Sequence, residues 1–112
     1  MINKLCHFEI GCRDYARIKD FYSKVFDWRF EKTPGGEEMI RTGDDVGGHL
    51  DQRRDAPRNY VVFYVMVDDV DAAVKTAESL CGKTVLGPAK EHHGTFAWIA
   101  DPEGNVVGVY TE

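Results

Sequence analysis

The chain begins with a stretch in which apolar and polar side chains alternate. Between residues 4 and 12, one side of an extended strand carries Cys6, Phe8, Ile10 and Cys12. The other side carries Leu5, His7, Glu9 and Gly11. Strict alternation of this kind is typical of a half-buried strand. We expect the first set to face a core and the second to form a polar face.

A helix is predicted directly after this strand. Asp14 has the character of an N-cap, because its carboxylate can accept hydrogen bonds from the free amides of a first helical turn. The helix should run to about Asp27. Its apolar residues recur at the spacing of one helical face: Ile18, Phe21, Tyr22, Val25 and Phe26. We expect this stripe to pack on the sheet, and the charged Lys19 to face water.

The remaining pattern predicts three short strands and then a second copy of the whole arrangement. The strands cover residues 28–32, 38–42 and 46–51, and Gly/Pro or Gly/Asp turns separate them. The second copy has a strand at 60–67, a helix from Asp69 to Cys81 and strands at 83–89, 94–100 and 105–111. In its first strand, alternation puts Val61, Phe63, Val65 and Val67 on the core face.

The two halves of the chain are related by an internal repeat. A shift of 55 residues lays Phe8 on Phe63, Ile10 on Val65 and Asp14 on Asp69. The fold class is therefore α+β, with two βαβββ modules and a cavity between the repeats or between subunits. We interpret residues 1–112 as a single domain that consists of module one (4–52), a linker (53–59) and module two (60–112).

Composition and charge exclude several classes of function. The chain is 43% hydrophobic and 29% charged, as in ordinary globular proteins, and no run of apolar residues is long enough for a membrane span. Its formal net charge is -5 and its basic residues are scattered, so we expect no nucleic-acid partner and no membrane partner. No secretory signal precedes the first strand, and three cysteines suit reduced thiols, so we expect a cytoplasmic protein.

Three segments, in this order, resemble the vicinal oxygen chelate superfamily, which includes glyoxalase I, bleomycin-resistance proteins and extradiol dioxygenases. They are DYARIKDFYSKVFDW, VDDVDAA and DPEGNVVGVY. The chain looks most similar to the single-domain, glyoxalase-like members. The resemblance implies a curved sheet in each module and a cavity that a second subunit completes in many members. It therefore implies a homodimer.

The resemblance also implies four metal-ligand positions, on the first and last strand of each module. Here they correspond to His7, His49, Val62 and Gly108. Valine and glycine side chains cannot bind a metal, so the family set is incomplete. Gly108 also stands where glyoxalase I has the glutamate that acts as its base. Glu9 or Asp51 could add a carboxylate to the two histidines, but Glu9 lies two residues from His7, about 7 Å along the strand.

We therefore predict a small-molecule ligand held in a cavity lined by polar and aromatic side chains. The candidate ligand-binding residues are His7, Glu9, His49, Asp51, Tyr60, Tyr64, Met66, Trp98 and Tyr110. The catalytic candidates among them are His7, Glu9 and His49. Either Phe96 or Trp98 should point inward or lie at a subunit contact. His92 and His93 lie in a loop from which one imidazole could reach a site.

Three interpretations of function stay open. The first is a glyoxalase-like protein of unknown substrate that needs no cofactor. The second is a metal-dependent lyase or isomerase similar to lactoylglutathione lyase, or a dioxygenase, with a divalent metal on His7 and His49. The third is a bleomycin-resistance type of protein that sequesters an antibiotic. The acidic net charge is compatible with the third interpretation and does not single it out.

Overall fold

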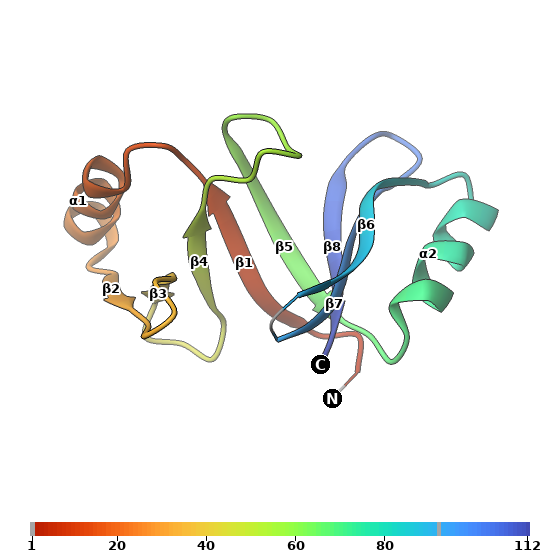
Figure 1. Cartoon of the computed structure of the whole chain (residues 1–112), viewed down its shortest axis with the longest axis horizontal. Coiled ribbons are helices and arrows are strands. Elements are labelled where there is room, and N and C mark those ends of the chain that lie inside the picture. The colour runs from red at the N-terminus through yellow and green to blue at the C-terminus, as the bar shows by residue number, and fades with distance from the viewer. Residues whose placement is uncertain (1, 92) are drawn as a thin grey trace. The chain divides into compact units, whose positions relative to one another are not determined.

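A computed structural model describes residues 2–91 and 93–112, and in this part of the chain the pattern βαβββ occurs twice (Figure 1). The first copy consists of β1 (Leu5–Gly11), α1 (Tyr15–Phe26), β2 (Arg29–Lys32), β3 (Glu38–Arg41) and β4 (Gly47–Asp51). The second consists of β5 (Tyr60–Met66), α2 (Val70–Ser79), β6 (Lys83–Glu91), β7 (Gly94–Ala100) and β8 (Val106–Thr111). The predicted α+β class is confirmed, and the element bounds lie close to the expected ones.

The chain divides into two compact units. The first unit is His7–Val61, and the second is Val62–Glu112 together with the residues that lead up to Cys6. In the first unit the strands lie in the order β2-β3-β4-β1, and in the second they lie in the order β5-β8-β7-β6. In both units the first and last strands of the copy pair in parallel and the other pairs are antiparallel. The internal repeat is therefore a repeat of topology.

The strand register matches the two copies residue by residue. In the first unit Glu9 of β1 lies opposite His49 of β4. In the second unit Tyr64 of β5 lies opposite Gly108 of β8. A parallel pair of this kind places both side chains on one face of the sheet. Glu9 therefore corresponds to Tyr64, and His49 corresponds to Gly108, as the sequence alignment of the two copies predicts.

Both helices begin at the predicted caps. Asp14 accepts a hydrogen bond from the Arg17 amide at 3.1 Å, and Asp69 accepts one from the Ala72 amide at 3.1 Å. Each cap satisfies a backbone donor that the first turn leaves unpaired. The second helix ends at Ser79, before the predicted Cys81, because Cys81 has a φ of 70° and so leaves the helical conformation. No described helix is both long and apolar enough to cross a membrane.

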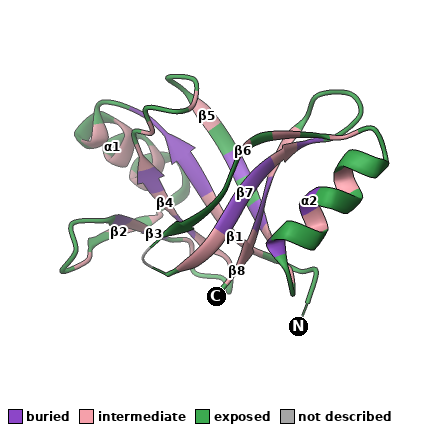
Figure 2. Cartoon of the chain, turned by 45° about the vertical axis from the view of Figure 1, so that its right-hand side comes forward, coloured by how far each residue is buried: buried purple, intermediate pink, exposed green. Residues whose placement is uncertain are grey.

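The apolar stripe of α1 is only partly buried, which corrects the expectation from its periodicity. Ile18 and Tyr22 pack against a core of Ile10, Cys12, Ile40 and Leu50. Phe21, Val25 and Phe26 are each more than half exposed. Helix α1 as a whole shows intermediate and exposed residues and no buried one (Figure 2). Periodicity locates an apolar face of a helix, but it does not say how wide the surface beneath that face is.

The expected core face of β5 is covered at one end only, where Val65 lies opposite the buried Val109 and Val67 packs against the core cluster that contains Val109. Val61 is 69% exposed and Phe63 is 46% exposed, whereas Val62 and Tyr64 on the opposite face are 2% and 6% exposed. The strand reads YVVFYVM and is apolar on both faces. Alternation therefore had no polar side to distinguish, and the folded unit covers parts of both faces of the strand.

Lys19 does not simply face water as predicted. Its Nζ lies 3.0 Å from Oε1 of Glu38, a carboxylate on β3 that is only 4% exposed. A buried carboxylate needs a partner because burial removes its hydration. Lys24 provides a contrast, since it pairs with Asp20 while both side chains are largely exposed.

We predict that Lys19→Ala lowers the free energy of unfolding by about 1–3 kcal/mol, because it removes the cation from a buried carboxylate. Chemical denaturation at neutral pH measures this change. Lys24→Ala is the matched control and should cost less than about 0.5 kcal/mol, as exposed pairs contribute little. Equal effects of the two substitutions would contradict the role given to the Lys19–Glu38 pair.

Candidate functional site

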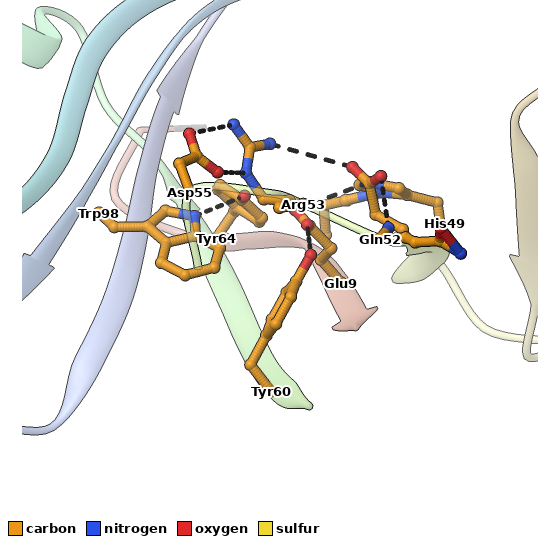
Figure 3. Close-up of polar contacts among 10 residues, drawn as sticks. Glu9, His49, Gln52, Arg53, Asp55, Tyr60, Tyr64 and Trp98 are labelled. Atoms are coloured by element: carbon orange, nitrogen blue, oxygen red, sulfur yellow. Dashed lines mark hydrogen bonds and ion pairs between the residues drawn. The ribbon is translucent and has the colours of Figure 1, made fainter. Parts of the chain in front are cut away.

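The centre of the candidate site is Glu9, a carboxylate in β1 that is 1% exposed. The Tyr60 hydroxyl donates a hydrogen bond to its Oε2 atom (Figure 3). Gly11 makes this contact possible, because a Cβ at that position would overlap the Tyr60 ring. Burial and the adjacent Glu9 carboxylate raise the pKa of Tyr60, so its phenol stays protonated and acts as a donor.

His49 lies across the strand pair from Glu9 and joins it to a second carboxylate. Its Nε2 atom is 3.6 Å from Oε1 of Glu9 and 3.6 Å from Oδ2 of Asp51. Asp51 follows His49 by two residues and so shares its face of β4. One donor atom from each of these three residues lies within 4.8 Å of the other two. Two strands thus bring an imidazole and two carboxylates together.

His7 contacts the other side of the His49 ring. Its Nε2 atom lies 2.6 Å from Nδ1 of His49, and the two rings stack with centroids 4.9 Å apart. At this distance one nitrogen carries the hydrogen and the other accepts it. Burial, helped by the nearby His49, lowers the pKa of His7 from 6.5 to about 4. His7 is therefore a neutral imidazole at physiological pH.

Asp51 is held from two sides. Its Oδ1 atom accepts a hydrogen bond from the Gln52 amide at 2.7 Å, and Nη1 of Arg53 lies 3.9 Å from its Oδ2 atom. The His49 side chain is the main cause of the lowered pKa of Asp51, so this carboxylate is ionised at neutral pH. Arg53 is 13% exposed and also binds Asp55 at 3.0 Å. The sequence pattern placed Arg53 in a linker and gave no sign of this contact.

In the second unit the matching positions form an apolar cluster. Tyr64 stands where the first unit has Glu9, and its hydroxyl accepts a hydrogen bond from the Trp98 indole at 2.8 Å. Trp98 and Val62 are each 2% exposed. The Tyr64 ring covers Gly108, so that a Cβ at position 108 would overlap it. The ring thus takes the space that a fourth ligand side chain would need.

The structure groups the other predicted residues as follows. Met66 lies opposite Tyr110 in the β5–β8 pair, and the Tyr110 hydroxyl donates to the His93 carbonyl at 2.7 Å. Phe96 and Trp98 are both buried on one face of β7, so the structure does not single out one of them as the inward-facing residue. They are two residues apart and a strand repeats every two residues. His92 lies outside the described residues.

The four ligand positions implied by the family resemblance do not fit a metal. His7 and His49 offer imidazoles, but Val62 offers only carbon, and Gly108 has no side chain beneath the Tyr64 ring. The donors of the second unit are therefore missing on chemical grounds. Among residues 2–91 and 93–112, the potential ligand atoms that lie close together are those of Glu9, His49 and Asp51, all in the first unit.

Comparison with known proteins identifies the family of the chain. Residues 7–110 match the family model of the glyoxalase-like domain. The chain belongs to this family and, with it, to the vicinal oxygen chelate superfamily. A "glyoxylase-like domain-containing protein" of Didymella fabae is 28% identical in an alignment that covers 92% of this chain and 89% of that protein.

Solved structures share the fold at low sequence identity. A methylmalonyl-CoA epimerase from Streptomyces coelicolor, in complex with 2-nitronate-propionyl-CoA, has a TM-score of 0.67 at 16% identity and covers 100% of this chain and 96% of its own. A protein described as an NAD-dependent benzaldehyde dehydrogenase from Legionella pneumophila has a TM-score of 0.70 at 12% identity, with 94% and 96% covered. The two descriptions differ in chemistry, so the site must decide the function.

We predict that Gly108→Ala destabilises the chain strongly and that Tyr64→Ala in the same chain relieves part of the loss. The added Cβ overlaps the Tyr64 ring, and overpacking typically costs about 1–3 kcal/mol. A double-mutant cycle by denaturant unfolding measures the coupling. Strictly additive effects would show that the ring does not occupy the space over Gly108.

We also predict that the chain loses stability as the pH falls from about 6.5 toward 4 through His7. Its folded pKa of about 4 lies below the ordinary 6.5, so within this window the unfolded chain binds a proton that the folded chain does not. His7→Gln should flatten that part of the stability profile. His93→Gln, which changes an exposed histidine, should leave it unchanged. If the free energy of unfolding of the native chain and of His7→Gln changed with pH in the same way, the role given to His7 would be contradicted.

Proposed function

We propose that this glyoxalase-like protein binds a small organic molecule through the polar cluster of its first unit. The cluster consists of Glu9, His49, Asp51, Tyr60 and His7. The observation that carries the proposal is the burial of the Glu9 carboxylate at a position where the second unit, with the same topology, has Tyr64. The fold does not require a carboxylate there.

The energetic argument follows from the cost of burying charge. A buried carboxylate loses its hydration and is retained only where partners compensate it, and such groups concentrate at binding and catalytic sites. Tyr60 supplies one hydrogen bond to Glu9, and His49 lies beside its other oxygen. Tyr64, by contrast, buries an aromatic ring at the same position with its hydroxyl bonded to Trp98. The comparison of the two units supports a functional reason for Glu9.

The charges of the cluster indicate what kind of ligand it would select. Glu9 and Asp51 are acceptors, and His7 is a neutral imidazole at physiological pH. A ligand that presents hydrogen-bond donors or a positive charge would complement these groups. We therefore propose an amine, an amidine or a similar donor-rich small molecule. The cytoplasmic location and the homodimer expected from the sequence stay predictions.

A ligand screen tests this proposal. Amines and amidines, each paired with a neutral isostere of the same shape, are measured by thermal shift and then by calorimetry, with EDTA present throughout. The basic member of a pair should bind more tightly, and Glu9→Gln should weaken its binding by about 10-fold or more, as expected for a hydrogen bond to a charged group.

Glu103→Gln is the matched control for this experiment, because it makes the same chemical change on an exposed turn. It should bind the selected ligand as the native chain does. The proposal fails if neutral and basic members bind equally, if no member binds, or if Glu9→Gln, shown to be folded by circular dichroism, binds with unchanged affinity.

A further inference from the structure

We propose that Glu9, His49 and Asp51 form a divalent metal site that belongs to the first unit alone, with His7 behind it as a positioning residue. This set differs from the four family positions, of which only His7 and His49 carry possible ligands here. The ion would use the same carboxylates as the proposed organic cation, so the two would compete, and metal binding is therefore measured with the metal alone. The residues come from two adjacent strands whose register places Glu9 opposite His49.

One donor atom of each of the three side chains lies within 4.8 Å of the donor atoms of the other two. Nε2 of His49 lies 3.6 Å from Oε1 of Glu9 and 3.6 Å from Oδ2 of Asp51. These separations are too long for good hydrogen bonds. Two ligand atoms 3.6 Å apart, each about 2.1–2.2 Å from one metal ion, would subtend an angle of about 110–120°. That angle suits a tetrahedral or trigonal metal ion.

A second observation concerns the remaining atom of each side chain. Oε2 of Glu9 accepts from the Tyr60 hydroxyl, and Oδ1 of Asp51 accepts from the Gln52 amide. Nδ1 of His49 is 2.6 Å from Nε2 of His7. In each of the three side chains, a neighbouring group thus holds the atom that is not proposed as a metal ligand, and this contact fixes the orientation of the side chain. Metal ligands are typically oriented in this way by an outer layer of hydrogen bonds.

This arrangement gives His7 a specific role. When Nε2 of His49 binds a metal, its Nδ1 must carry the hydrogen and donate it to Nε2 of His7. His7 therefore sets the tautomer of His49 and does not touch the ion. Arg53 is a competing cation, since its Nη1 atom lies 3.9 Å from Oδ2 of Asp51, although its Nε atom is bound to Asp55. The ion would have to displace that weak contact.

The donor set favours a first-row divalent ion. One imidazole and two carboxylates suit Zn²⁺, Co²⁺, Mn²⁺ or Fe²⁺ better than Mg²⁺, which prefers an all-oxygen octahedron with several waters. Three protein ligands leave at least one coordination position for water or an organic oxygen. Such an ion would act as a Lewis acid toward a ligand oxygen.

The test uses the purified full chain, stripped with chelator and dialysed, and titrated with Zn²⁺, Co²⁺ or Mg²⁺ alone. Calorimetry should give one Zn²⁺ or Co²⁺ per chain and much weaker Mg²⁺ binding. Glu9→Gln, His49→Gln and Asp51→Asn should each weaken Co²⁺ binding by 100-fold or more. Asp44→Asn removes an exposed carboxylate of the same unit and should leave binding unchanged. Circular dichroism establishes that each variant is folded.

The visible spectrum of bound Co²⁺ separates a ligand from a positioning residue. His7→Gln should weaken Co²⁺ binding by about 10- to 100-fold and leave the spectrum at saturation unchanged, because the ligand atoms are the same. A changed spectrum would make His7 a direct ligand and overturn the assignment. The site itself would be overturned if the native chain bound neither Zn²⁺ nor Co²⁺. It would also be overturned if the three ligand variants bound Co²⁺ as well as the native chain does. The organic-ligand screen, run in EDTA, is independent of either result.

Discussion

The parallel pairing between the first and last strand of each βαβββ copy is the constraint on which the rest of the structure depends. Parallel strands cannot be joined by a tight turn, so each copy needs a helix and two further strands before its chain can return beside its start. The pairing then fixes which side chains meet. Glu9 faces His49 in one unit, and Tyr64 faces Gly108 in the other. One register produces a polar cluster in the first unit and an apolar one in the second.

Because of the repeat, the two units of the chain can be compared with each other. Both units pack an apolar core against a helix that begins at an aspartate cap. They differ on the opposite face, where the first unit buries a carboxylate among imidazoles and a phenol and the second buries Tyr64 against Trp98. The shared fold accounts for what the two have in common. The shared fold does not explain a feature that only one unit has. Among these features, the buried carboxylate of the first unit has the largest energetic cost.

The sequence predicted the elements, the caps and the alignment of the two copies, because these depend on local periodicity and on short-range hydrogen bonds. It also placed His7, Glu9 and His49 on the correct strand faces. It could not predict that Tyr60 reaches Glu9, since the two residues are 51 positions apart and the contact depends on the missing side chain of Gly11. The Lys19–Glu38 ion pair was not predicted for the same reason. A charged residue on a helix is expected to face water unless its partner on another element is known.

The aromatic ring over Gly108 has a consequence for how such a chain can change. A substitution at position 108 meets the Tyr64 ring, and a smaller residue at position 64 leaves a void beside Trp98 while Gly108 still lacks a side chain. Each change alone is therefore disfavoured, and a side chain at position 108 requires a change at both positions. The packing of the Tyr64 ring over Gly108 thus makes these two positions depend on each other.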